Sequence, residues 1–154
     1  MEIERKYLIT NLPEDLDAYP FHVIEQAYIC TDPVIRIRRQ DDDYYLTCKG
    51  TGMMSREECN LPMSAQAYSS LMNKTEGCVI RKRRYLIPAQ DGRTIELDCF
   101  EGVHAPLVIA EVEFESEDQA NAFKAPGWFS REVTYDGRYH NSWLSTHTAE
   151  ELDH

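Results

Sequence analysis

Charged side chains recur at every second position along several short segments of this chain. The first segment, MEIERKYLIT, places Glu2, Glu4 and Lys6 on one face if it is extended, because successive side chains of a strand alternate between its faces. Two carboxylates and an ammonium group on one face could hold a metal cation and an anion together. The same spacing returns in six later segments, so the charged faces are a feature of the whole chain and not of one segment.

The charged residues at this spacing form a group that we call the charged set. Its acidic members are Glu2, Glu4, Glu58, Glu96, Asp98, Glu111 and Glu113, and its basic members are Lys6, Arg36, Arg38, Lys49, Arg56, Lys82 and Arg84. The two signs balance within the set, although the 154 residues include 27 acidic and 16 basic side chains and carry a net charge of −11. All of the net negative charge therefore lies outside the charged set.

Two arrangements explain such a pattern. A charged strand face is usually the solvent side of a half-buried antiparallel sheet. Alternatively, the strands close into a barrel with a charged interior and an apolar exterior under helices, and eight strands leave room inside for one small ligand. Exposed sheet faces usually mix in Thr, Ser and Gln, whereas Arg, Lys, Glu and Asp recur here. That composition favours the barrel.

A charged barrel interior has a definite chemistry. Arginine forks and lysine point charges on several strands would bind a multiply charged anion. The carboxylates would repel that anion unless they held a divalent cation, and ligation by oxygen alone suits Mg²⁺ or Mn²⁺. Basic side chains and a metal ion around a polyphosphate are what phosphoryl transfer requires.

The elements that position the charged set are mostly strands. Alternating runs rich in β-branched and aromatic residues predict strands near 2–10, 21–30, 34–40, 44–50, 55–61, 78–88, 94–100 and 107–115, with a shorter ninth run near 129–134. The stretch Gln90-Asp91-Gly92-Arg93 predicts a hairpin. Helices are predicted over 63–74, over 116–124 behind a serine N-cap, and near 140–145. This mainly β (α+β) pattern suits a barrel or a sandwich.

Composition narrows the class of protein. No run of about 18 apolar residues predicts a membrane span, and residues 1–10 lack the apolar segment of a secretory signal. The acidic balance argues against a nucleic-acid partner. The five cysteines are scattered without a C-x-x-C pair, which argues against a disulfide framework and for a reducing, cytoplasmic compartment. We expect these cysteines to pack in strands, and both monomer and homodimer remain open.

The sequence resembles the CYTH superfamily, the triphosphate tunnel metalloenzymes. Glu2-Ile3-Glu4-Arg5-Lys6 is similar to its E-x-E-x-K signature, and the resemblance continues along nearly the whole chain through Arg36-Ile37-Arg38, Thr47-Cys48-Lys49, Arg56-Glu57-Glu58, Lys82-Arg83-Arg84-Tyr85, Ile95-Glu96-Leu97-Asp98, Ala110-Glu111-Val112-Glu113-Phe114, Glu132-Val133-Thr134 and Arg138-Tyr139-His140-Asn141. The resemblance implies a single domain over 1–154: a closed eight-stranded antiparallel β-barrel, or tunnel, with a few short covering helices.

The resemblance also implies a role for each member of the site. The expected metal ligands for Mg²⁺ or Mn²⁺ are Glu2, Glu4, Glu111 and Glu113, with Glu58 and Asp98 as supporting or second-site ligands. The expected triphosphate-binding residues are Lys6, Arg36, Arg38, Lys49, Arg56, Lys82 and Arg84. Catalysis is expected to depend on Glu4, Lys6, Glu111 and Glu113. His140 departs from the family pattern, where a small polar residue is expected, but it lies outside the charged strands.

Four functions fit these expectations. The first is hydrolysis of inorganic triphosphate to pyrophosphate and phosphate, as in the short bacterial-type inorganic triphosphatases, because the chain lacks an obvious extra domain or a purine-reading motif. The second is thiamine triphosphate or nucleoside triphosphate hydrolysis, and the third is a class IV adenylate cyclase. The fourth is a polyphosphate-binding module without turnover. The acidic pairs argue against the fourth function, since binding alone needs only the basic residues.

Overall fold

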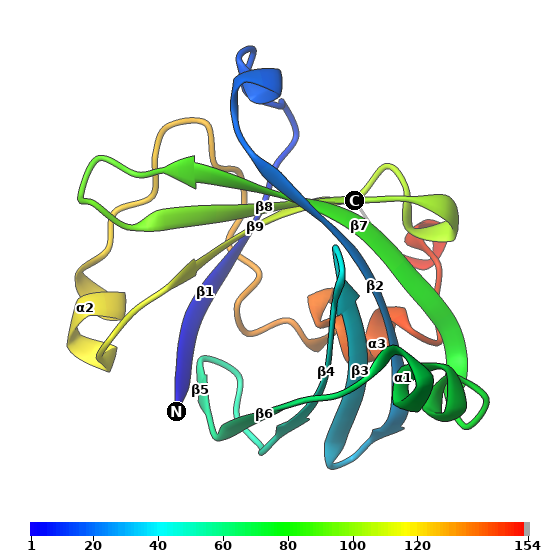
Figure 1. Cartoon of the computed structure of the whole chain (residues 1–154). Coiled ribbons are helices and arrows are strands. Elements are labelled where there is room, and N and C mark those ends of the chain that lie inside the picture. The colour runs from blue at the N-terminus through cyan, green and yellow to red at the C-terminus, as the bar shows by residue number, and fades with distance from the viewer. Residues whose placement is uncertain (153–154) are drawn as a thin grey trace.

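Nine strands form one continuous antiparallel sheet in the computed structural model, which describes residues 1–152. The strands are β1 (Glu2–Leu8), β2 (Phe21–Thr31), β3 (Val34–Gln40), β4 (Asp43–Lys49), β5 (Ser55–Arg56), β6 (Glu58–Pro62), β7 (Glu76–Pro88), β8 (Thr94–Phe100) and β9 (Val108–Glu113). Their order in the sheet is β5-β1-β9-β8-β7-β2-β3-β4-β6 (Figure 1). Residues 153 and 154 of the predicted domain lie outside the described residues.

The sheet closes into a barrel through β5 and β6. Only Glu57 separates these two short strands along the chain. β5 pairs with β1, where Arg56 lies opposite Glu2, and β6 pairs with β4, where Glu58 lies opposite Lys49. The two strands therefore occupy the place of one, and the barrel has eight positions. The predicted antiparallel barrel is confirmed as a nearly closed sheet, and its strand count is nine in place of the predicted eight because of the break at Glu57.

Strand register brings the charged set to the inside of the barrel. Glu4 lies opposite Glu113, and Lys6 opposite Glu111, across β1 and β9. Residues directly opposite in an antiparallel pair share one face of the sheet. The same inner face continues across β8, β7 and β3, so the alternation seen in each segment is one continuous inner surface.

The other face of the strands is apolar and is covered by helices. Ala120 of α2 (Glu117–Ala122) and the aromatic residues that follow the helix pack in one cluster with outward residues of β1, β7, β8 and β9, among them Leu97 and Val112. α1 (Ala65–Met72) covers β2 and β3, where Tyr68 packs against Ala27 and Ile37. Each covering element removes apolar surface from water, which is the main favourable contribution to the free energy of folding.

One end of the barrel interior is apolar. Tyr28, Ile80, Phe100 and Ile109 lie on the inner face beyond the charged residues, and they form one cluster that also contains residues of the C-terminal segment. That segment carries α3 (Asn141–Leu144), whose Leu144 is fully buried in the cluster. The cluster therefore closes this end and confines the charged groups to the remaining part of the interior.

Local signals explain where the helices and the hairpin begin. The side chains of Ser64 and Ser116 accept hydrogen bonds from backbone N–H groups in the first turns of α1 and α2, as N-caps do. Gly92, at φ +89°, supplies the left-handed residue in the hairpin between β7 and β8. Short 3₁₀ helices occupy Leu16–Ala18, Gly102–His104, Gly137–Tyr139 and Ala149–Glu151.

None of the helices within residues 1–152 is both long and apolar enough to span a membrane.

Two local expectations were wrong. The run 129–134 is not a strand, because a single bridge joins Glu132 to Tyr7 and the backbone N–H of Lys6 donates to the side chain of Thr134 in place of a ladder bond. The expectation that the cysteines pack in strands fails for Cys48 and Cys59, which are exposed. Their strand faces point outward where no helix covers them.

We expect Leu97→Ala to destabilise the protein by about 2–5 kcal/mol, because it removes a fully buried side chain from the cluster under α2. Leu61→Ala is the matched control, since that leucine is 61% exposed and such substitutions change stability by less than about 0.5 kcal/mol. Urea denaturation followed by circular dichroism measures both values. Equal losses in the two variants would contradict the assignment of this cluster as core.

Candidate active site

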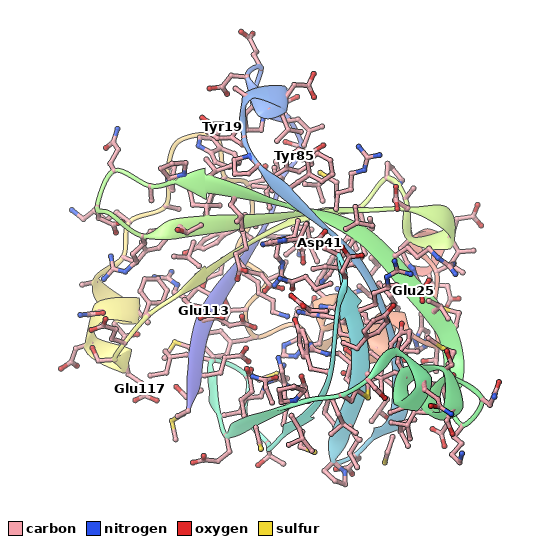
Figure 2. The ribbon with its side chains drawn as sticks, in the orientation of Figure 1. Tyr19, Glu25, Asp41, Tyr85, Glu113 and Glu117 are labelled. Carbon is pink, nitrogen blue, oxygen red and sulfur yellow. The ribbon has the colours of Figure 1, made fainter. Side chains whose placement is uncertain are left out.

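A cavity of about 620 Å³ opens into the barrel. Every member of the charged set lines it except Lys82, Glu96 and Asp98. Side chains crowd the space that the strands enclose, with Glu113 beside β1, whereas Glu117 lies at the periphery near α2 (Figure 2). The structure therefore brings together charged residues that lie more than 100 positions apart in the sequence.

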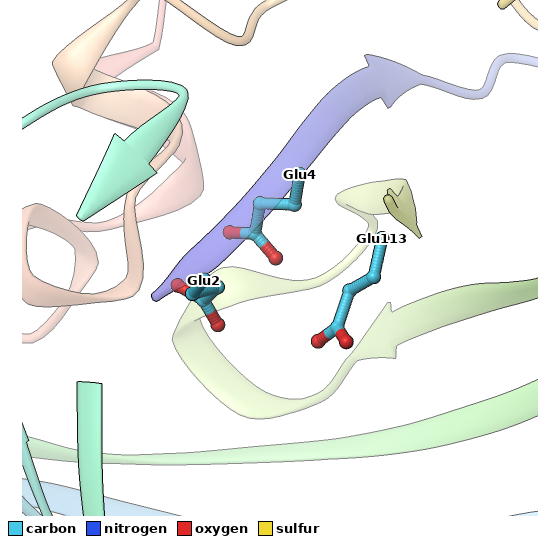
Figure 3. A group of neighbouring side chains, drawn as sticks. All are labelled: Glu2, Glu4 and Glu113. Carbon is cyan, nitrogen blue, oxygen red and sulfur yellow. The ribbon is translucent and has the colours of Figure 1, made fainter. Parts of the chain in front are cut away.

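Three carboxylates form a cluster at one wall of the cavity. Glu2 and Glu4 come from β1, Glu113 comes from the end of β9, and one oxygen of each lies within 4.8 Å of the others. Their carboxyl groups point toward one another (Figure 3). The register opposes Glu4 to Glu113, and the two-residue period of β1 adds Glu2. An oxygen-only donor set of this kind suits Mg²⁺ or Mn²⁺.

The carboxylates of this cluster resist ionisation. Burial, and then repulsion from Glu111, raises the pKa of Glu4 to about 8. Desolvation by the barrel wall, followed by repulsion from Glu96 and Glu2, raises the pKa of Glu113 to about 7. A divalent cation would relieve the repulsion and favour the ionised forms of both groups.

Glu111 and Lys6 form the buried ion pair behind this cluster. The Lys6 Nζ atom lies 3.7 Å from Glu111 Oε1 and also 3.7 Å from Glu4 Oε1. Burial works to raise the pKa of Glu111, but Lys6, Arg84 and Lys82 together hold it well below its usual range. Glu111 therefore stays ionised, whereas Glu4 retains a proton until a cation or a higher pH removes it.

Arg36 and Arg38 are buried without a carboxylate partner. Within residues 1–152, no acidic group forms an ion pair with either guanidinium. Arg36 donates to the hydroxyl of Thr47 at 3.0 Å, and Arg38 donates to the amide oxygen of Gln26 at 2.8 Å. The Nε atom of Arg36 has no hydrogen-bond partner among the described residues. Buried charge that lacks a counter-ion is costly, so this wall favours an anionic ligand.

The two walls face each other across the barrel. Because β5 and β6 share one position, β3 lies four positions from β9 in either direction around the barrel. Arg36 and Arg38 on β3 therefore face the side that carries Glu111 and Glu113. An anion held by the arginines would lie against the cation held by the carboxylates, which is the geometry that a metal–polyphosphate complex requires.

Lys49, Arg56 and Glu58 lie beside the carboxylate cluster. Lys49 Nζ lies 3.0 Å from Glu2 Oε1 and 3.6 Å from Glu58 Oε2, and Arg56 Nε lies 3.6 Å from the same oxygen of Glu2. These groups line the cavity as the sequence predicts. Their ion pairs are long or shared, which leaves donor capacity on both cations for a ligand.

Lys82, Arg84 and Asp98 form a closed network next to the cavity. Arg84 binds both oxygens of Asp98, through Nε at 2.8 Å and Nη2 at 2.9 Å. Lys82 Nζ lies 2.6 Å from Asp98 Oδ2 and donates to Asn141 at 3.1 Å. Burial lowers the pKa of Lys82 to about 7, although Asp98 opposes that shift. Only Arg84 of these three lines the cavity, so Lys82 and Asp98 are not placed at the predicted ligand site.

Sequence reasoning did not assign the uncharged groups that hold the charged ones. Gln26, Thr47 and Asn141 bind Arg38, Arg36 and Lys82 respectively. For Gln26 and Thr47 the alternation of strand residues could have indicated this role, because each lies on the inward-facing side of its predicted strand. For Asn141 the family resemblance of Arg138-Tyr139-His140-Asn141 was a signal, but it did not indicate contact with Lys82, since the helix of Asn141 reaches the barrel only through tertiary packing. His140 next to it is buried, and burial lowers its pKa to about 4.

Known proteins are similar to this chain in sequence and in fold. The chain matches the CYTH domain family over residues 1–132. It is 41% identical over 148 residues to the inorganic triphosphatase of Nitrosomonas europaea, covering 94% of this chain and 96% of that protein. It is 39% identical over 152 residues to the inorganic triphosphatase of Acetivibrio thermocellus, covering 93% and 92% respectively.

A solved structure leads to the same family. The crystal structure of the inorganic triphosphatase NE1496 superposes with a TM-score of 0.71 at 37% sequence identity, and the match covers 96% of this chain and 95% of that one. The family match spans all of the strands that line the cavity. By sequence and by structure, the chain belongs to the CYTH family.

Proposed function

We propose that this chain hydrolyses inorganic triphosphate to pyrophosphate and phosphate, with a divalent cation, inside the barrel. The observation that carries the proposal is the pairing of a carboxylate cluster with two arginines that lack counter-ions, across one cavity. The similarity to proteins named inorganic triphosphatase supports the substrate. A multiply charged anion with a bound cation neutralises both walls at once.

Glu2, Glu4 and Glu113 are proposed to hold the cation. Their oxygens converge within 4.8 Å and come from rigid strands, which limits the reorganisation that binding requires. When bound, Mg²⁺ or Mn²⁺ supplies positive charge for phosphate oxygens and lowers the pKa of a bound water. Glu111 is proposed to support the cluster from behind, because its ion pair with Lys6 fixes both side chains.

The basic residues are proposed to bind and orient the triphosphate. Arg36 and Arg38 offer planar forks that match phosphate oxygens, and Lys6, Lys49 and Arg56 add charge near the cation side. Arg84 also lines the cavity, but its fork binds Asp98, so it is proposed to add positive charge to the wall. Because these groups come from different strands of a closed barrel, the substrate would be held from several directions. Such positioning is most of what an enzyme contributes to phosphoryl transfer.

Three predicted site residues receive different proposed roles from their surroundings. Glu58 accepts from Asn60 at 2.8 Å and pairs with Lys49, so it is proposed to orient that lysine. Lys82 and Asp98 lie outside the cavity lining, and they are proposed to fix Arg84. Direct ligation by Glu58, Asp98 or Glu111 stays a prediction from the sequence.

A substrate panel tests the proposed function. We expect tripolyphosphate to be hydrolysed with a higher kcat/KM than thiamine triphosphate or ATP, in the presence of Mg²⁺ or Mn²⁺, because the cavity walls recognise phosphate and metal. Release of orthophosphate measures all three reactions, and chelation of the metal should stop them. Cyclic AMP formed from ATP would indicate a cyclase, and binding of tripolyphosphate without turnover would indicate a binding module.

Glu4→Gln should lower kcat for tripolyphosphate by more than about 100-fold, which exceeds the usual effect of residues that only support a metal ligand. The substitution keeps the shape of a buried side chain but removes a proposed oxygen donor. Glu57→Gln is the matched control, because Glu57 is an exposed glutamate on the closing segment of the barrel. Normal activity of Glu4→Gln, with an unchanged requirement for metal, would contradict the assigned cluster.

Affinity for the cation should rise with pH between about pH 6 and pH 9. The pKa values of Glu4 and Glu113 are raised to about 8 and about 7, so both groups are largely protonated at the lower pH and must release protons to bind metal. Isothermal titration with Mn²⁺ in the absence of substrate measures this affinity. The same raised pKa values make the metal-free protein less stable as pH rises from 4.5, the ordinary pKa of a glutamate, to about 8, because the unfolded chain ionises these groups first and ionisation is unfavourable in the folded state. A cation affinity that does not change with pH would contradict these shifts.

A further inference from the structure

Cys48 and Cys59 lie directly opposite each other on neighbouring strands. The register of β4 and β6 pairs the two residues, and both thiols are free and exposed (Figure 1 shows the two strands). Their neighbours Thr47, Lys49 and Glu58 face the barrel interior, so the cysteines share the outer face. Neither residue takes part in the proposed chemistry, and neither is needed to fill the core.

The backbone spacing suits a disulfide bond. Backbone hydrogen bonds run from Gly50 N–H to the Glu57 carbonyl and from Met63 N–H to the Tyr44 carbonyl, each at 2.9 Å. Hydrogen-bonded pairs alternate with non-bonded pairs along an antiparallel ladder, so the cysteine pair is of the hydrogen-bonded kind. The Cα atoms of such pairs lie about 5.5 Å apart, close to the commonest separation across a disulfide.

The side-chain geometry would make that bond easy to reduce. The Cβ atoms of a hydrogen-bonded pair are up to about 5.5 Å apart, whereas a relaxed disulfide needs about 3.8 Å. One strand must therefore move, and β6 is free to do so, because it pairs with β4 on one edge and with no other strand within residues 1–152. Strained and exposed disulfides have the higher reduction potentials typical of labile or regulatory bonds.

We propose that Cys48 and Cys59 form a reversible cross-strand disulfide that acts on the substrate site. One thiolate attacks a low-molecular-weight disulfide, RSSR, and expels one RS⁻. The second thiolate attacks the resulting mixed disulfide at the protein sulfur, forms the Cys48–Cys59 bond and expels the second RS⁻. The cysteine pair loses two electrons, RSSR gains them, and the two thiol protons end on two RSH molecules.

The bond would reach the substrate site through the adjacent inward pair. Thr47 lies opposite Asn60, one position along from the cysteines, and its hydroxyl donates to Asn60 Oδ1 at 2.6 Å. The same hydroxyl accepts from Arg36, which is proposed to bind phosphate. Movement of β6 toward β4 would shift Asn60 and weaken the positioning of Arg36. This effect on binding rests on the proposed function, whereas the bond itself does not.

Oxidised glutathione, added to the full chain, tests the proposal in two independent measurements. Thiol titration and peptide mapping under non-reducing conditions should show the loss of two free thiols and a bridge between the peptides of Cys48 and Cys59. The KM for tripolyphosphate should rise by about two- to tenfold, the effect of weakening one hydrogen bond, with a smaller change in kcat. A dithiol reductant should reverse both changes.

Matched variants separate the possible outcomes. After treatment with oxidised glutathione, Cys48→Ser and Cys59→Ser should keep the KM that the protein has in its reduced state. Cys30→Ser should still form the bridge. Stable glutathione adducts on both cysteines, or disulfides between two copies of the chain, would overturn the proposal. A mapped bridge with an unchanged KM would overturn its coupling to the substrate site. If the reduced protein does not turn over triphosphate, the proposed function fails while the bridge can still be measured.

Discussion

The structure depends on the burial of both signs of charge inside one closed barrel. Removing an ion from water costs several kcal/mol even after relaxation, so buried charges persist only when they are paired. Most of the interior meets this condition: Lys6 lies between Glu4 and Glu111, and Arg84 binds both oxygens of Asp98. Arg36 and Arg38 are exceptions, and they face the wall that carries the carboxylate cluster, so a metal–anion complex between the two walls would supply their missing counter-charge.

The distribution of charge explains how an acidic protein can serve an anionic substrate. The net charge of −11 belongs to residues outside the charged set, where water and salt screen it. Inside the barrel the dielectric response is weaker, and the guanidinium groups of Arg36 and Arg38 have no carboxylate partner among the described residues. Local geometry therefore decides which ligand is attracted, and the net charge does not.

The closing segment and the C-terminal segment hold the walls in register. β5 and β6 join β1 to β4, so the strand that carries Glu2 and Glu4 is fixed to the strand that carries Lys49. On the outside, Arg5 forms two 2.8 Å hydrogen bonds with Glu132, and the hydroxyl of Thr134 accepts from the N–H of Lys6 at 2.9 Å. A shift at either place would alter the spacing between cation and anion sites.

The sequence by itself determined the strands, the inward face and the members of the charged set, because a two-residue period assigns each side chain to one face without knowledge of its neighbours. It did not determine which charges are paired. Lys82 and Arg38 have similar sequence surroundings, yet one is neutralised by Asp98, whereas the other donates to the neutral Gln26 and has no carboxylate partner among the described residues. Nor did it determine that residues 129–134 attach to β1 by irregular backbone hydrogen bonds with one bridge, or that Asn141 reaches Lys82. Only the tertiary structure decided these points, because pairing depends on register between distant strands, which alternation within one strand does not specify.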